Sequence, residues 1–80
     1  MADDQNVVIY STPSCVHCQH AKEFFQEHDI NYTDHDVSSD QEKRQEMVEK
    51  SGQMGVPVIY VGDEMVVGFD KQRLSELLGV

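Results

Sequence analysis

The two cysteines of the chain stand where a short β-branched segment gives way to a helical pattern. Segment 7–10, VVIY, is β-branched at three positions and predicts a buried strand. Residues 11–14 break this segment, and Ser14 is the expected N-cap of a helix. One face of this helix should carry the residues that recur at helical spacing, namely Ala21, Phe24, Phe25 and His28. A fold for this chain must therefore hold Cys15 and Cys18 at a strand-to-helix junction.

Segment 30–37 predicts a second strand, because its apolar residues alternate with polar ones and charged or titratable residues follow. Such a half-exposed strand suits the edge of a sheet. Ser39 and Glu42 form a capping box, which predicts the start of a second helix. We expect this helix to run to about residue 51, with Gly52 just after its end.

The last third of the chain predicts a hairpin and a third helix. Segments 58–61 and 65–67 are apolar and rich in β-branched residues, and the Gly-Asp pair at 62–63 suits a turn between them. Asp70 is the expected N-cap of the third helix, and Gly79 follows its end. A leucine-rich face of this helix should pack on the sheet.

The resulting order, β-α-β-α-β-β-α, predicts an α/β fold with a mixed four-stranded sheet flanked by helices. The first two strands should be parallel and joined by a right-handed crossover, whereas the last two should be antiparallel. The sequence has 80 residues and neither repeats nor linkers, so we expect one domain over residues 1–80 with a modest core. An activity of such a chain should rest on a few residues near its surface.

Composition disfavours several kinds of partner. Fifteen acidic and six scattered basic residues leave a formal net charge of −9, which is unsuited to nucleic acid and anionic membranes. The acidity is also compatible with a salt-rich cytoplasm, where it would be screened. Residues 1–6 lack a basic targeting segment, and no stretch approaches the roughly 18 apolar residues of a membrane span. We therefore expect a cytoplasmic, monomeric protein.

Cys15 and Cys18 are spaced C-x-x-C, and residues three apart on a helix lie about 5–6 Å apart at Cβ. That separation is close to what a disulfide requires. The free N–H groups and the dipole at a helix start favour a thiolate at Cys15. Cys15 is therefore the predicted nucleophile. Cys18, one turn deeper, is the predicted resolving thiol, which closes the disulfide and releases reduced substrate.

Other uses of the cysteine pair are less well supported. A static disulfide that closes so short a loop contributes little stability, and disulfides rarely persist in the cytosol. A metal site needs about four ligands, and no Cys/His pair recurs at ligand spacing, so we expect no metal. His17 is either a solvent-exposed residue or a group that further favours the thiolate. The remaining histidines are expected to be structural, namely His20, His28 and His35. A C-x-x-C in a βαβ pattern is typical of redox chemistry.

Three motifs connect the chain to a family. YSTPSCVHC at 10–18, GVPV at 55–58 and VGFD at 67–70 resemble, in this order and at these separations, the glutaredoxin-like redoxins of bacteria and archaea, which have the thioredoxin fold. The resemblance implies a cis proline at Pro57, with the backbone of Val56 pairing with substrate peptide or glutathione. It also implies that the other side of this groove is lined by Gly68, Phe69 and Asp70. By local pattern alone these three are a turn residue, a hydrophobic staple and a helix cap.

Departures from the family pattern bear on the source of electrons. Dithiol glutaredoxins typically have Pro-Tyr where this chain has Val-His at 16–17, and usually a Gly where it has Val67. They often have a Lys, which pairs with a glutathione carboxylate, where it has Thr12. Three other features, Pro13, Val16 and the Gly-Phe pair at 68–69, are more similar to the NrdH-redoxin-like branch, which serves ribonucleotide reductase and takes electrons from thioredoxin reductase.

The residues and the resemblance together predict a thiol–disulfide oxidoreductase that reduces protein disulfides by a Cys15/Cys18 cycle and binds no cofactor. Its electrons would come from NADPH through thioredoxin reductase. Its substrates would be disulfide-containing proteins such as ribonucleotide reductase or a peroxidase. Three alternatives remain open: a glutathione-dependent glutaredoxin, an iron–sulfur or zinc carrier that shares ligands across a dimer, and an interaction module with an idle cysteine pair. The intact C-x-x-C and the groove motifs argue against the last.

Overall fold

The computed structural model describes residues 6–53 and 55–80, so the prediction that no targeting segment is present falls partly on residues 1–5, outside the described residues. The order β-α-β-α-β-β-α is confirmed. Its elements are β1 (Val7–Ser11), α1 (Val16–Glu27), β2 (Thr33–Asp36), α2 (Gln41–Ser51), β3 (Val58–Val61), β4 (Glu64–Val67) and α3 (Lys71–Leu78). Within the described ranges, every helix is too short or too polar to span a membrane.

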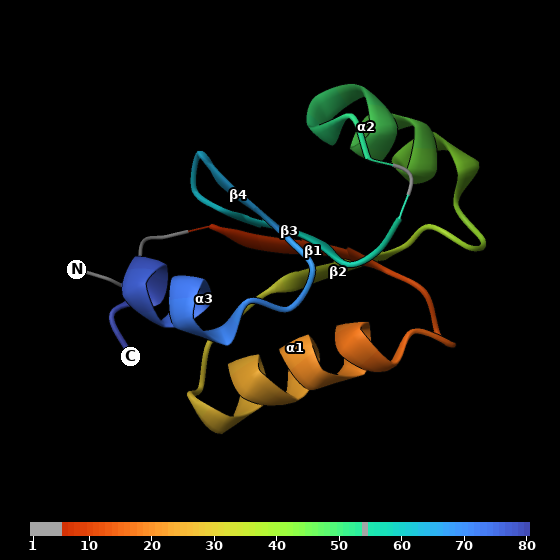
Figure 1. Cartoon of the computed structure of the whole chain (residues 1–80). Helices are drawn as coiled ribbons and strands as arrows, with labels where there is room; N and C mark the ends of the chain where they lie inside the picture. The colour runs from red at the N-terminus through yellow and green to blue at the C-terminus, as the bar shows by residue number, and fades with distance from the viewer. Residues whose placement is uncertain (1–5, 54) are drawn as a thin grey trace.

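The four strands form one mixed sheet in the order β2-β1-β3-β4. β1 is parallel to β2 and β3 is antiparallel to β4, as predicted, and β1 is antiparallel to β3. In this register Ile9 of β1 lies between Asp34 of β2 and Ile59 of β3. α1 and α3 cover one face of the sheet and α2 covers the other (Figure 1). The half-exposed strand β2 lies at a sheet edge, which confirms its predicted place.

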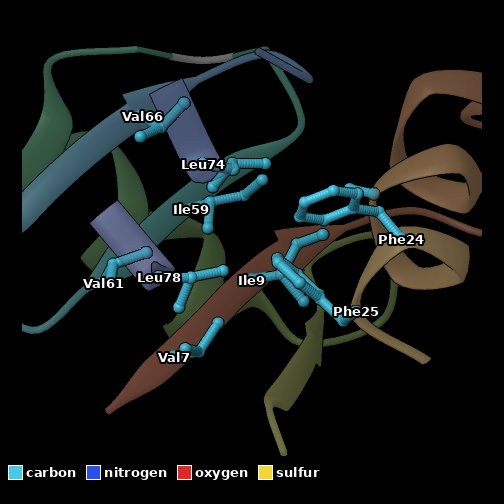
Figure 2. Close-up of a cluster of buried hydrophobic side chains, with 10 residues drawn as sticks. Val7, Ile9, Phe24, Phe25, Ile59, Val61, Val66, Leu74 and Leu78 are labelled. Carbon is cyan, nitrogen blue, oxygen red and sulfur yellow. The ribbon is translucent and has the colours of Figure 1, made fainter. Parts of the chain in front are cut away.

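The larger buried cluster fills the space between the sheet and helices α1 and α3 (Figure 2). It contains ten buried residues from these elements, namely Val7, Ile9, Ala21, Phe24, Phe25, Ile59, Val61, Val66, Leu74 and Leu78. A smaller buried cluster lies under α2 and comprises Tyr10, Val37, Met47 and Val58. Because α1 supplies three members of the larger cluster, that cluster holds in place the helix that carries both cysteines.

Two of the predicted helix caps are off by one residue. Cys15, not Ser14, is the N-cap of α1, because its sulfur accepts the hydrogen bond from the Cys18 backbone N–H that a hydroxyl would usually accept. Asp40, not Ser39, is the N-cap of α2, and its carboxylate accepts from the Lys43 N–H at 3.2 Å. The Ser39 hydroxyl instead donates to the Asp36 carbonyl at 3.4 Å. A charged acceptor thus caps α2 in place of the predicted serine.

The ends of three further predicted elements also differ. β2 begins at Thr33 rather than residue 30, because the Ile30 N–H still bonds the Phe25 carbonyl in the turn that ends α1. β4 begins one residue early, at Glu64, which pairs with Val61 across the hairpin turn. His28 does not belong to the buried face of α1: it is the exposed C-cap residue. The helix ends predicted at Gly52 and Gly79 and the cap predicted at Asp70 are confirmed.

Candidate active site

The loop between β1 and α1 positions Cys15 at the first turn of the helix. Cys15 has an extended backbone, with φ −88° and ψ 113°, and its sulfur accepts from the Cys18 N–H at 3.1 Å. The loop is fastened at two further points: the Cys15 N–H donates to the Thr12 carbonyl at 3.3 Å, and the Gln19 side-chain amide donates to the Pro13 carbonyl at 3.1 Å. The partly exposed Cys15 sulfur therefore lies among the N–H groups at the helix start.

Cys18 lies one turn further along α1 in a different environment. It is a free thiol, as is Cys15, but its exposed fraction is 0%. Burial, followed by its hydrogen bond with Cys15, raises the pKa of Cys18 to about 12, although the Thr12 backbone and the charge of Lys22 act in the opposite direction. The prediction that Cys18 is the less exposed thiol is confirmed.

The other two motifs meet beside Cys15. The Val56–Pro57 peptide bond is cis, as the resemblance implies, and Pro57 is buried. The Cys15 thiol donates a long hydrogen bond, 3.9 Å, to the Val56 carbonyl, and the Gly68 N–H donates to the Pro57 carbonyl at 2.8 Å. Gly68 has φ 82°, a conformation that other residues rarely adopt. The fold thus brings Cys15, Val56 and Gly68, from three separate segments, to one place.

Phe69 and Asp70 extend away from the sulfurs. The Phe69 ring lies 5.9 Å from Phe24 and 6.3 Å from His20, measured between ring centroids. It borders an open hollow of about 260 Å³ whose other lining residues are His20, Glu23, Phe24, Glu27 and Lys71. The Asp70 carboxylate accepts from the Arg73 N–H at 3.1 Å and caps α3. The structure therefore confirms the packing role of Phe69 and the capping role of Asp70.

The four histidines lie at or near the surface. His17 is exposed, and its ring stands edge-on to that of His20 with centroids 6.3 Å apart. His28 packs on Phe24 and the half-buried His35 on Tyr10, with centroid distances of 4.6 and 5.3 Å. Among residues 6–53 and 55–80, no group of three or more His, Cys, Asp or Glu side chains could hold a metal ion.

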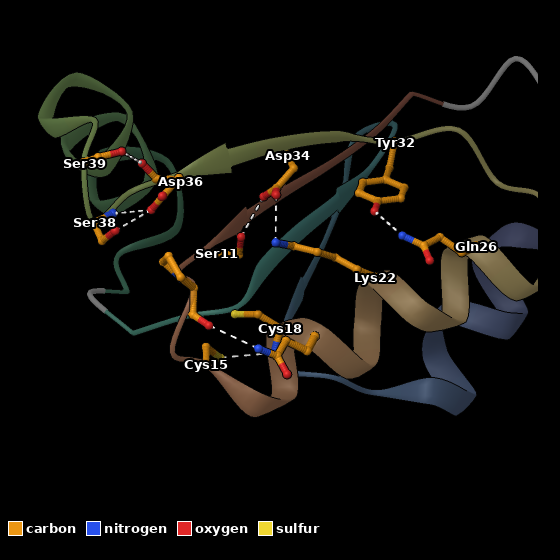
Figure 3. A network of polar contacts seen from close by, with 12 residues as sticks. Ser11, Cys15, Cys18, Lys22, Gln26, Tyr32, Asp34, Asp36, Ser38 and Ser39 are labelled. Atoms are coloured by element: carbon orange, nitrogen blue, oxygen red, sulfur yellow. Dashed lines mark hydrogen bonds and ion pairs between the residues drawn. The ribbon is translucent and has the colours of Figure 1, made fainter.

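A polar network beside Cys18 was not predicted from the sequence (Figure 3). Lys22 of α1 pairs with Asp34 of β2 at 2.7 Å, and the buried Ser11 hydroxyl donates to the other oxygen of Asp34 at 2.6 Å. One sequence signal did exist: Lys22 follows Cys18 by four residues, which puts both on the same side of a helix. The partner Asp34 could not be found this way, because its position depends on the pairing of β1 with β2.

The chain is similar to several known proteins. The glutaredoxin family model matches residues 7–66. The glutaredoxin-like 8.6 kDa protein of the rubredoxin operon of Clostridium pasteurianum is 39% identical, with 90% of this chain and 96% of that protein covered. The crystal structure of a mutant of the thioredoxin-like protein BC3987 has a TM-score of 0.89 at 27% identity, with 94% of this chain and 96% of that one covered.

A further solved structure shares the fold. NrdH-redoxin from Escherichia coli, described as a glutaredoxin-like protein with a thioredoxin-like activity profile, has a TM-score of 0.79 at 24% identity, with 90% of this chain and 93% of that one covered. The family match spans both cysteines and the cis proline. The predicted fold, with its mixed four-stranded sheet and flanking helices, is thus that of known glutaredoxin-like proteins. This chain belongs to the glutaredoxin family of thiol–disulfide oxidoreductases.

Proposed function

We propose that this chain reduces disulfides of other proteins by a dithiol–disulfide cycle in which Cys15 attacks and Cys18 resolves. The observation that carries the proposal is the unequal placement of the two thiols. Cys15 is partly exposed at the helix start, whereas Cys18 is buried one turn below with its pKa raised to about 12. Only the Cys15 sulfur is therefore both accessible to a substrate and close to groups that favour a thiolate.

The cycle transfers two electrons. The Cys15 thiolate attacks one sulfur of the substrate disulfide, a mixed disulfide forms, and the second substrate sulfur leaves as a thiolate. Cys18 then loses its proton and attacks the Cys15 sulfur, so the bond to the substrate breaks and the reduced substrate departs. The chain is left with a Cys15–Cys18 disulfide, which an external reductant must return to the dithiol.

Substrate binding is assigned to the segments that meet at Cys15. An extended substrate segment would pair with the backbone of Val56, whose carbonyl lies 3.9 Å from the Cys15 sulfur. Gly68, fixed to Pro57, would form the next part of the groove, with Phe69 and Asp70 beyond it. Val16, 59% exposed directly after the nucleophile, offers an apolar contact for a protein substrate. Thr12, whose carbonyl accepts from the Cys15 N–H, would line the same groove next to the nucleophile.

The electron source is proposed to be NADPH through thioredoxin reductase, with no cofactor bound to the chain. A glutathione site needs a cation for a glutathione carboxylate, and Thr12 has none to offer. Lys22 is already paired with Asp34. Protein substrates with disulfides, such as ribonucleotide reductase or a peroxidase, remain the proposed partners. Turnover with NADPH and thioredoxin reductase should exceed turnover with glutathione and glutathione reductase. Efficient turnover at millimolar glutathione would instead assign the chain to the glutathione-dependent class.

Two single substitutions test the cycle. Cys15→Ser should abolish reduction of a protein disulfide such as that of insulin. Cys18→Ser should accumulate a mixed disulfide between Cys15 and the substrate, because attack still occurs and resolution does not. Intact-protein mass spectrometry would detect that adduct, and dithiothreitol should release it. A Cys18→Ser protein that formed no adduct, beside a Cys15→Ser protein that did, would reverse the two roles.

A further inference from the structure

The proposed cycle leaves one step unexplained, namely how a buried thiol becomes a nucleophile. Cys18 has no exposed surface, and burial is the largest cause that raises its pKa. A thiolate formed there without a nearby positive charge or hydrogen-bond donor would be strongly disfavoured. Two groups act against this increase: the Thr12 backbone and the positive charge of Lys22 both lower the pKa of Cys18.

Lys22 is held at this position by an ion pair with Asp34 of β2, and a hydrogen bond from Ser11 of β1 holds Asp34. Its ammonium lies 2.7 Å from one oxygen of Asp34, while the Ser11 hydroxyl, 2.6 Å from the other oxygen, fixes the carboxylate in turn. Ser11 is 1% exposed, whereas the side chains of Lys22 and Asp34 are 24% and 34% exposed, so the network is buried at Ser11 and open to water at the ion pair. In Figure 3 the Cys18 sulfur and the Lys22 ammonium both extend from α1 toward the sheet.

We infer that Lys22, positioned by Asp34 and Ser11, stabilises the Cys18 thiolate as it forms in the resolving step. This inference rests on the proposed Cys15/Cys18 cycle and adds to it a positioning residue. In the step, the Cys18 thiol releases its proton to solvent and its sulfur bonds the Cys15 sulfur. The bond between Cys15 and the substrate sulfur breaks, and the substrate thiolate takes up a proton from solvent.

The charged groups near this step lie on α1 and β2. On α1 the charged group is Lys22, because the Cys15 sulfur is bonded to the substrate in this step. On β2 they are Asp34, which pairs with Lys22, and Asp36, whose pKa the charge of Lys22 also lowers. The carboxylate of Asp36 is itself bonded by the Ser38 hydroxyl and N–H, which hold its pKa below the usual range. Lys22 therefore lies between a sulfur that must become negative and carboxylates that already are, and it is the positive member of the set.

The test separates attack by Cys15 from resolution by Cys18 in stopped flow. Dithiobis(nitrobenzoate) releases one coloured thiolate when Cys15 attacks and a second when Cys18 resolves. Lys22→Met removes the charge and keeps the length of the side chain, whereas Lys22→Arg keeps the charge. Lys43→Met, on α2, is the control for the same change in net charge. The Cys18→Ser background isolates the first release, because no second release can follow.

Lys22→Met should slow the second release about tenfold near neutral pH and shift its pH profile upward by about one unit. Lys22→Arg and Lys43→Met should behave like the wild type, and the first release in the Cys18→Ser background should not depend on Lys22. The inference would be overturned if the second release had the same rate in Lys22→Met as in Lys43→Met. It would also be overturned if Lys22→Met slowed the first and second releases equally. A Cys18→Ser protein that forms no mixed disulfide would overturn the proposed cycle itself, so the two failures are distinguishable.

Discussion

Cys15 and Cys18 are separated by one turn of α1, yet they differ in exposure and in the groups they contact. Cys15 caps the helix, is partly exposed and contacts the Val56 carbonyl, whereas Cys18 is closed off under the helix beside the Thr12 backbone. Burial, followed by the hydrogen bond with Cys15, raises the pKa of Cys18, whereas the partial exposure of Cys15 leaves that thiol within reach of a substrate. A single helical turn at the edge of a core can thus give two chemically identical groups two roles.

The largest expected effect comes from breaking the burial of Cys18. Phe25→Ala removes a fully buried side chain of the cluster that holds α1, and we expect a loss of about 3–5 kcal/mol in the free energy of unfolding. The loosened helix should also let iodoacetamide reach Cys18. Urea unfolding and alkylation rates would measure both effects.

Met47→Ala is the matched control for that variant, since Met47 is equally buried but lies in the smaller cluster under α2. It should cost about 2–5 kcal/mol without making Cys18 more reactive. If both variants exposed Cys18 to the same extent, the burial of this thiol would depend on global stability and not on the packing of α1.

A substitution at Thr12 should change which reductant the protein uses without changing the burial of Cys18. Thr12→Lys supplies the cation that glutathione-dependent members often have at this position. A hydrogen bond to a charged group is worth roughly 1.5–3 kcal/mol, so glutathione-driven turnover should rise by about one to two orders of magnitude. A coupled assay with glutathione reductase measures the gain, and unchanged turnover would remove Thr12 from the account of donor choice.

Replacing His17 should have a smaller effect, on the stability of the Cys15 thiolate and hence on the redox potential. An imidazole in the first turn of α1 adds positive charge or an N–H donor near Cys15, so His17→Val should destabilise the thiolate and make the disulfide harder to reduce. We expect the potential to fall by about 30 mV, which corresponds to about 1.4 kcal/mol for this two-electron couple. A dithiothreitol redox titration checks this value. Identical potentials would leave His17 as a surface residue that packs on His20.

The smallest effect is expected far from both sulfurs, on the α2 face. The Tyr10 hydroxyl donates to Glu46 at 2.5 Å, and this bond holds the pKa of the Glu46 carboxyl below its usual range. The contribution of Glu46 to stability is therefore present above the pKa of an unfolded glutamate and is lost as the pH falls through the lower, folded value. The free energies of unfolding of the wild type and of Glu46→Gln should differ slightly near pH 7 and become equal in acid. A difference that persisted in acid would show that it does not come from the ionised Glu46 carboxylate.

Much of the fold followed from local sequence patterns, because strands, turns and helix ends are signalled by residues close together in the chain. The two errors in helix caps arose where a neighbouring acceptor took the place of the predicted serine, as when the Cys15 sulfur replaced a serine hydroxyl at the start of α1. Likewise, Asp40 capped α2 one residue after the predicted Ser39. Propensity alone does not rank such competing acceptors.

The candidate site was predictable to a lesser degree. The spacing of Cys15 and Cys18 indicated redox chemistry, but only the family resemblance pointed to a cis bond at Pro57, which local pattern makes improbable. The pairing of Lys22 with Asp34 was out of reach, because it joins a helix to a strand whose register is set by the assembled sheet. Contacts between distant segments are where sequence patterns carry least information.

The most direct test of the unequal thiols is alkylation of the reduced wild-type protein with limiting iodoacetamide near neutral pH. Fragment-ion mass spectrometry distinguishes the two cysteines even when one peptide contains both. The partly exposed position of Cys15 and the burial of Cys18 predict that Cys15 is modified first and that Cys18 reacts only after unfolding. Modification of Cys18 first, or of both at the same rate, would contradict the assignment of Cys15 as the nucleophile.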